Sequence, residues 1–328
     1  MKYSDINFNN KIILITGGAG FIGSSIAFYL QDNYPDVNII IFDCFRNNEL
    51  LPNGNLLSYG HYKNLIGFKG EVICGNINSK DDLSLLSNYK FDYIFHQAAI
   101  SDTRAYNQEM VMKTNVNSFY DLLKIAKKNQ SVMVYASSAA TYGGLPSPQV
   151  EGNESPENPY GYSKLLMDQI AFRYANENPN MTIVGLRFFN VYGPREFYKA
   201  KTSSMIIQLG HQILANKSPR LFENSNKILR DFVFIEDVVQ ANIKACNVKS
   251  NGTYNVGTGI SRSFKDIIDI LQKELTTSLN IEYFPNPYDG YQLNTQADIT
   301  LSKENFQYDP VFSLEQGIKS YLPEIKRL

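Results

Sequence analysis

Short apolar runs alternate with helical patterns along the first half of the chain. Each run is rich in β-branched or aromatic residues, a pattern typical of strands buried on both faces of a parallel sheet. The predicted strands are Lys11–Thr16, Val37–Phe42, Glu71–Cys74, Phe91–Phe95, Val132–Ala136 and Thr182–Phe188. Helical patterns lie between them, at Ser24–Leu30, from about Gln108 and after Pro159. The alternation predicts an α/β fold of the Rossmann type, with a doubly wound parallel sheet.

The alternation loosens beyond residue 188. The elements predicted there are helices near Ser203–Ala215, from about Glu236, near Phe264–Glu274 and near Ser313–Leu322, and strands at Arg220–Phe222 and Thr253–Val256. We therefore divide the chain into a first domain, residues 11–188, to which the second half adds further elements, and a smaller mixed α/β lobe, mainly residues 189–328. Residues 47–67 are polar and aromatic, and we expect a loop with a short helix there.

A glycine-rich turn follows the first predicted strand. Residues 17–23 read Gly-Gly-Ala-Gly-Phe-Ile-Gly, with a strand before them and a helix after them. Gly17, Gly20 and Gly23 let the backbone turn sharply and approach a pyrophosphate, and the helix N-terminus offers free amides. Because this context is present, we interpret the turn as a dinucleotide site rather than as a merely structural feature. Residues 11–188 are then a dinucleotide-binding domain, and residues 189–328 mainly bind substrate.

Polar residues at the ends of the next strands extend this interpretation. Asp43 follows the second strand, where an acidic residue meets the adenine ribose hydroxyls and favours NAD. Arg46 follows closely and could hold the 2′-phosphate of NADP instead, so this stretch leaves the choice open. Asn76 and Asn78 either reach an adenine edge or form a turn. We interpret His96 as a packed residue at the end of a strand rather than as a catalyst.

Tyr160 and Lys164 lie four positions apart, on one face of the helix that is predicted to begin near Pro159. An ammonium at ~5 Å from a phenol contributes about 3 kcal/mol at an effective dielectric of ~20. Lowering a phenol pKa from about 10 to about 7 requires roughly 4 kcal/mol, so Lys164 nearly suffices to make Tyr160 an acid/base near neutral pH. Ser138, at the end of the fifth strand, is expected to hydrogen-bond a substrate oxygen. Each residue alone is ordinary; together they predict a catalytic set.

Composition narrows the class of protein further. The 328 residues are 43% hydrophobic and 19% charged, with a net charge of −1, so no electrostatic argument favours nucleic acid or a membrane surface. No apolar run has the length of a membrane-spanning helix. Residues 1–10 lack the apolar stretch of a signal peptide, and the three cysteines have neither disulfide nor metal-ligand spacing. We expect a cytoplasmic protein without a metal site.

Six segments carry a recognisable pattern: GGAGFIG (17–23), HQAA (96–99), SSAATYG (137–143), YGYSK (160–164), RFFNVYGPR (187–195) and RDFVFIEDV (230–238). Together they resemble the extended short-chain dehydrogenase/reductases that act on nucleotide sugars. Residues 190–205, 221–232 and 291–298 are most similar to the ADP-glyceromanno-heptose 6-epimerase family within that group. The resemblance implies inversion of C6″ in ADP-D-glycero-D-manno-heptose through a transient 6″-ketone, in lipopolysaccharide core biosynthesis. It also implies tightly bound NADP, with NAD sometimes accepted, and a homo-oligomer, often a pentamer.

The resemblance also assigns roles to individual residues. It implies two acid/bases on opposite sides of the sugar, Tyr160 and Lys199, with Lys164 and Ser138 assisting. The implied cofactor-binding residues are Gly17, Gly20, Phe21, Ile22, Gly23, Asp43, Cys44, Arg46, Gln97, Ala98, Ala99, Ile100, Ser101, Asn115, Lys164, Val191 and Lys199. The implied substrate-binding residues are Ser138, Asn190, Lys201, Gln208, Phe222, Glu223, Asn224, Ser225, Arg230 and Tyr291.

Three positions depart from the family pattern. Asn224 replaces a glycine, Gln208 a histidine and Lys201 a serine, which bears on the exact sugar nucleotide and on the carbon that is oxidised. The alternative is an NAD(P)-dependent C4 dehydrogenase or C4 epimerase of a nucleotide-linked heptose or another nucleotide sugar. A 4,6-dehydratase is disfavoured because Ala139 and Ala140 stand where that class carries an Asp-Glu pair. A cofactor-sensing binding protein is disfavoured because Ser138, Tyr160 and Lys164 are all present.

Overall fold

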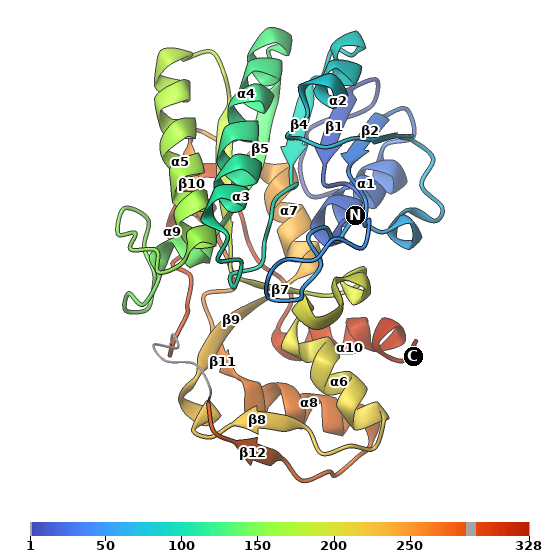
Figure 1. The fold of residues 1–328 in the computed structure, drawn as a ribbon, viewed down its shortest axis with the longest axis vertical. Helices are drawn as coiled ribbons and strands as arrows, with labels where there is room; N and C mark the ends of the chain where they lie inside the picture. Colours follow the sequence, from blue (N-terminus) through green and yellow to red (C-terminus); the bar gives the residue numbers. More distant parts are fainter. Residues whose placement is uncertain (1, 287–292, 328) are drawn as a thin grey trace.

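In the computed structural model, which describes residues 2–286 and 293–327, seven parallel strands form the central sheet. They are β1 (Ile12–Thr16), β2 (Asn38–Asp43), β3 (Glu71–Cys74), β4 (Tyr93–His96), β5 (Val132–Ser138), β6 (Ile183–Phe188) and β10 (Gly252–Val256). Their order across the sheet is β10-β6-β5-β4-β1-β2-β3, shown in the upper part of Figure 1. This order confirms the predicted doubly wound sheet, and its switch point between β1 and β4 is where such sheets bind ligands.

Helices cover both faces of this sheet because its strands are apolar on both sides. The helices are α1 (Phe21–Asn33), α2 (Lys80–Ser84), α3 (Gln108–Met112), α4 (Ser118–Asn129), α5 (Pro159–Glu177), α7 (Ile235–Ala245) and α9 (Thr300–Phe306). Ile13 and Ile15 of β1 pack in one core with α1 and α7, whereas Leu14 packs in the other with α4 and α5. The alternation of side chains along each strand thus fills two cores.

The remaining elements form a smaller lobe below the sheet in Figure 1. They are β7 (Asn190–Tyr192), β8 (Arg220–Phe222), β9 (Leu229–Phe234), β11 (Ser261–Ser263), β12 (Glu282–Phe284), α6 (Met205–Leu214), α8 (Phe264–Leu275) and α10 (Leu314–Ile325). The strands form a three-stranded sheet in the order β11-β9-β7 and a pair, β12-β8. Buried residues of α6, α8 and α10 belong to the same apolar cluster as those of α1 and α7, so the two parts share a core.

Candidate active site

The start of α5 brings Tyr160 against the segment that follows β5. The Asn158 side chain accepts a hydrogen bond from the Gly161 N–H at 2.8 Å, and Pro159 occupies the first turn, as expected for a helix start. A Cβ on Gly161 would lie 2.4 Å from the Ala140 carbonyl oxygen. Only glycine allows this approach, which sets Tyr160 beside Ser138.

Ser138, Tyr160 and Lys164 come together at the carboxyl end of β5. The Ser138 hydroxyl is hydrogen-bonded to Tyr160 and accepts from the Ala140 N–H at 3.1 Å. The Lys164 Nζ lies 5.9 Å from the centre of the Tyr160 ring and donates to the Ala136 carbonyl at 2.8 Å. A hydroxyl, a phenol and an ammonium are therefore arranged side by side, a geometry suited to proton transfer at a substrate oxygen.

Burial dominates the electrostatics of this group. It raises the pKa of the Tyr160 phenol above its usual value, and the hydrogen bond with Ser138 opposes that shift. It also lowers the pKa of Lys164 to about 8, with Asp168 opposing. The expectation that Lys164 alone lowers the phenol pKa is therefore not met, because both groups lose their hydration. What the site gains is a lysine that can release its proton near neutral pH.

A buried polar network behind α5 holds this helix against the sheet. The Asp168 carboxylate accepts from Tyr135 at 2.9 Å and from Ser137 at 3.0 Å, and it pairs with Arg187 at 2.9 Å. Arg187 also pairs with Glu154. Sequence reasoning missed this network, although an arginine within the apolar strand and an acidic residue one turn after Lys164 were signals of it.

The glycine turn is close-packed against the end of β4. Gly17 has a φ of +69°, and a Cβ there would lie 2.6 Å from the Ala98 nitrogen. The N-cap of α1 is Gly20, which has no side chain to occupy the first-turn amides. Asp43 accepts from the Ala19 N–H at 3.0 Å and from the Phe45 N–H at 2.8 Å. The close-packed turn and the first-turn amides of a helix that begins at a glycine suit the pyrophosphate of a dinucleotide.

The predicted nicotinamide side is held by Asn115, which lies in a π-helical turn between α3 and α4. Its side chain accepts from the Ile100 N–H at 2.9 Å and donates to the Ile100 carbonyl at 3.0 Å and to Ser163 at 2.9 Å. Gln97 donates to Asn242 at 3.1 Å, and Ser101 is exposed. Asn115 therefore fixes the loop after β4 in place.

The structure also shows the positions of three other residues considered in the sequence, Asn76 after β3, His96 at the end of β4 and Cys44 after β2. Asn76 accepts from the Asn78 N–H at 2.9 Å, which is the turn-forming alternative. His96 is buried against Thr16 at 2.7 Å, which confirms a packed residue; burial lowers its pKa to about 3. Cys44 is exposed beside Ser58.

Lys199 lies in a 3₁₀ segment, Phe197–Thr202, that follows β7. Its Nζ is 5.8 Å from the centre of the Phe21 ring, at the start of α1. Burial lowers the pKa of Lys199, and the nearby Glu196 opposes the shift. The Glu196 carboxylate is buried and accepts from the Ser204 N–H and hydroxyl, both at 2.7 Å. The structure thus brings Lys199 to the glycine turn, on a loop from the smaller lobe.

Five of the predicted substrate residues of the smaller lobe fall on β8, β9 and the loop after β8, namely Phe222, Glu223, Asn224, Ser225 and Arg230. Asn224 has a φ of +60° and a ψ of 18°, the left-handed conformation that glycine and asparagine adopt most readily. The Ser225 hydroxyl is buried and has no hydrogen-bond partner among the described residues. Arg230 of β9 is 7% exposed and donates to the Leu229 carbonyl at 2.7 Å. Tyr291 lies outside the described residues.

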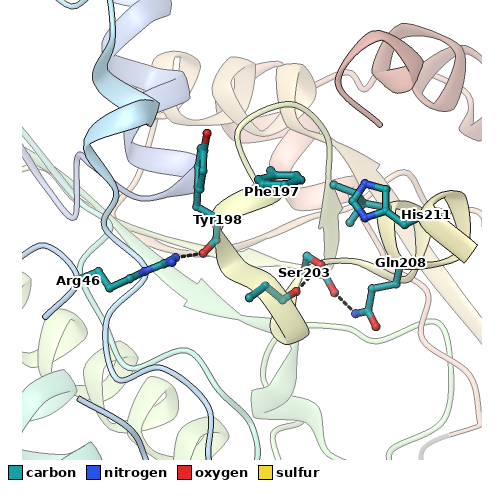
Figure 2. A pocket seen from close by; sticks show the side chains of 8 residues that line it. Arg46, Phe197, Tyr198, Ser203, Gln208 and His211 are labelled. Carbon is teal, nitrogen blue, oxygen red and sulfur yellow. Dashed lines mark hydrogen bonds between the residues drawn. The ribbon is translucent and has the colours of Figure 1, made fainter. Parts of the chain in front are cut away.

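A pocket of about 310 Å³ opens between Arg46, the 3₁₀ segment and α6. Figure 2 shows Arg46 directed toward the Tyr198 carbonyl, to which it donates a hydrogen bond. Gln208 of α6 lines the same pocket and donates to the Ser203 carbonyl at 2.7 Å. Asn190 is exposed and Val191 half-buried at β7, and Lys201 is exposed. Two predicted residues therefore line the pocket, Arg46 from the first domain and Gln208 from the smaller lobe.

The model of the NAD dependent epimerase/dehydratase family matches residues 13–257. The chain belongs to this family. Membership implies a nicotinamide cofactor, which the packing of the glycine turn accommodates. Among residues 2–286 and 293–327, no cluster of side chains is suited to a metal ion, and no helix is both long and apolar enough to span a membrane.

Three relatives narrow the position of the chain within the family. The ADP-L-glycero-D-manno-heptose-6-epimerase of Brachyspira hyodysenteriae is 35% identical over 96% of this chain and 98% of its own. The crystal structure of ADP-L-glycero-D-manno-heptose-6-epimerase from Helicobacter pylori is 48% identical, with all of both chains covered and a TM-score of 0.91. UDP-glucuronic acid 4-epimerase from Bacillus cereus, in complex with UDP-glucuronic acid and NAD, is 27% identical over 96% and 99% of the chains, with a TM-score of 0.81.

Proposed function

We propose that this epimerase inverts C6″ of ADP-D-glycero-D-manno-heptose to give the L-glycero form. The observation that carries the proposal is the full-length likeness to the Helicobacter pylori heptose epimerase, at 48% identity. The cluster of Ser138, Tyr160 and Lys164 at the end of β5 supports oxidation and reduction of a sugar carbon. The proposed epimerase activity therefore has both a homologous precedent and the side chains that its chemistry requires.

The proposed reaction passes through a ketone at C6″. When bound, the nicotinamide cofactor supplies the acceptor that makes C6″ a ketone and the donor that restores the alcohol on the opposite face. Tyr160 exchanges the hydroxyl proton on one side of the sugar, with Ser138 hydrogen-bonded to the same oxygen. Electrons and protons balance within each cycle, since the oxidation is reversed, so no cofactor is consumed.

Lys199 is the proposed acid/base for the other face. A single base reaches only one side of a ketone that turns over in the pocket, so the second face requires a second group. The lowered pKa of Lys199 supports this role, because it makes the ammonium a better proton donor and brings the amine closer to proton exchange. Tyr160→Phe and Lys199→Met should each lower turnover by orders of magnitude while the cofactor remains bound.

We propose tightly bound NADP as the cofactor and a homo-oligomer, a pentamer by likeness to the heptose epimerases, as the working form. The substrate contacts proposed in the smaller lobe are Asn190, Lys201, Gln208, Phe222, Glu223, Asn224, Ser225, Arg230 and Tyr291. Arg230 suits a diphosphate because its planar guanidinium forms paired hydrogen bonds. Mass spectrometry of the nucleotide released on denaturation identifies the cofactor, and light scattering gives the subunit number.

The decisive experiment is incubation of the purified protein with ADP-D-glycero-D-manno-heptose, without added cofactor, followed by NMR of the sugar. Conversion to the L-glycero epimer is the expected result. No conversion, even with NADP or NAD supplied, would favour the alternative of a C4 dehydrogenase or C4 epimerase. Release of reduced cofactor in proportion to substrate would distinguish that dehydrogenase from any epimerase.

A further inference from the structure

Tyr198, the residue before Lys199, is held by the loop that follows β2. The His61 ring stacks face to face on the Tyr198 ring, with centroids 3.9 Å apart and an angle of 8° between the planes. Arg46 from the same loop donates to the Tyr198 backbone carbonyl, as Figure 2 shows. Both the side chain and the backbone of Tyr198 are therefore fixed by residues more than a hundred positions earlier in the chain.

His61 is in turn attached to the glycine turn. Its backbone N–H donates to the Ala19 carbonyl at 3.0 Å, and its Nδ1 accepts from the Lys63 N–H at 3.1 Å, which caps a short 3₁₀ helix, Tyr62–Leu65. Burial, Arg46 and Lys63 all lower the pKa of His61, which favours the neutral form of the stacked ring. A continuous set of contacts thus runs from the glycine turn through His61 to Tyr198.

The loop that carries Lys199 has a backbone conformation that requires such support. Ala200 has a φ of 52° and a ψ of −122°, outside the regions that alanine ordinarily occupies. Such a conformation is strained and persists only where the surroundings determine it. Gln208 holds the far end of the loop through the Ser203 carbonyl, and the His61–Tyr198 contact holds the near end.

We propose that His61 is a positioning residue for Lys199: its backbone is hydrogen-bonded to the glycine turn, and its ring fixes Tyr198 and thereby directs the lysine amine toward the reacting sugar. The inference rests on the proposed function, in which Lys199 is the second acid/base. It adds that the turn suited to the cofactor phosphates and the placement of the second base are mechanically linked. His61 itself touches neither the sugar nor the proton that moves.

Two substitutions of His61 separate its ring from its capping nitrogen. His61→Asn keeps a side-chain acceptor for the Lys63 N–H but removes the stacked ring, whereas His61→Phe keeps the ring and loses the acceptor. We expect His61→Asn to lower kcat about tenfold to about a hundredfold, as a displaced catalytic group does, with KM changed less than about twofold. We expect His61→Phe to retain the kcat of the wild type.

Hydrogen–deuterium exchange of residues 196–204 in the cofactor-loaded protein gives a readout independent of activity. Faster exchange there in His61→Asn than in His61→Phe is expected. The reverse ranking in either measurement would show that the cap matters and the ring does not, and two variants indistinguishable from wild type would also overturn the proposal. If His61→Asn fails to fold, Tyr198→Leu against Tyr198→Phe tests the same contact from the other ring.

Tyr62→Ala is the matched control. Tyr62 also stacks on the His61 ring, with centroids 4.9 Å apart, but it is 63% exposed, so its removal should leave kcat and exchange unchanged. Lys199→Met tests the two-base mechanism separately from the positioning role of His61. Full activity of that variant would contradict the two-base mechanism, whereas an inactive Lys199→Met beside a fully active His61→Asn would overturn only the positioning role.

Discussion

Asn224 shows how one residue can depart from its family without disturbing the fold. The resemblance described above predicts glycine at this position, and Asn224 keeps the left-handed conformation that glycine provides, with a φ of +60°. Among residues with a side chain, asparagine enters this region at low cost because its amide bonds locally. From the sequence, this substitution bears on substrate specificity. The structure shows that asparagine keeps the backbone conformation required at this position.

Substitutions of Asn224 should follow this backbone requirement. Asn224→Ala is expected to lower the free energy of unfolding by about 1 kcal/mol, because alanine is strained at positive φ. Asn224→Gly should stay within about 0.5 kcal/mol of wild type. Urea denaturation of the three proteins makes the comparison. An alanine variant as stable as the glycine variant would contradict the argument.

Lys164 should make stability depend on pH in a recognisable way. Its pKa falls from 10.5 in the unfolded chain to about 8 in the folded protein, so between these values the unfolded chain binds more protons. The free energy of unfolding then rises with pH across this window, by up to about 3 kcal/mol from this group. The comparison is with Lys164→Met, which lacks the group, both proteins being stripped of cofactor. A wild-type advantage that stayed constant or shrank as pH rose would be inconsistent with a buried lysine.

At the scale of elements, the join between β5, α5 and β6 depends on Arg187. Its side chain is 3% exposed and pairs with Asp168, 5% exposed, and Glu154, 15% exposed. Arg187→Met leaves the buried carboxylate of Asp168 and the partly buried carboxylate of Glu154 without their partner, so we expect the free energy of unfolding to fall by about 3–5 kcal/mol.

An exposed ion pair provides the control for Arg187. Lys265 and Asp269 are both about half exposed on α8, and Lys265→Met should change stability by less than about 0.5 kcal/mol. Thermal unfolding followed by circular dichroism compares the variants. Equal losses of stability in the two variants would mean that the buried network contributes no more to stability than an exposed ion pair.

Most strands and helices could be predicted from the sequence, including the three-residue strand Arg220–Phe222, which matches β8, but three other short strands could not. The predicted strand Glu71–Cys74 matches β3 in full, and the predicted helix Phe264–Glu274 differs from α8 by one residue. The strands β7, β11 and β12 were not predicted; like β8 they have three residues each, too few to show a periodicity. They exist because distant segments pair with them, as β9 pairs with both β7 and β11, and local sequence does not encode that pairing.

The candidate site was predictable to a similar degree. Motif spacing placed Ser138, Tyr160 and Lys164 together because two of them share one helix face. It could not foresee that burial would raise the pKa of Tyr160, since burial is a property of the assembled fold. The contact of His61 with Tyr198 was also invisible, because it joins two loops that have no common pattern.

At the scale of the whole molecule, a bound cofactor should stabilise the folded chain. A ligand present at about a hundred times its dissociation constant adds about 2.7 kcal/mol, since it binds only the folded state. Protein stripped of nucleotide should therefore melt several degrees lower, and NADP should restore the melting temperature more than NAD at equal concentration. Differential scanning fluorimetry measures the melting temperature with each nucleotide, and a larger rise with NAD than with NADP would contradict the proposed preference.

The last strand to join the central sheet, β10, pairs with β6 although 63 residues separate Phe188 from Gly252. A ribosome adding ~5–20 residues per second needs several seconds to cover that stretch. During this time β6, buried at every position in the finished protein, presents an open apolar edge on which other chains can pair. The nascent protein thus passes through an interval of exposure to aggregation, and a message truncated before residue 252 would make that state permanent.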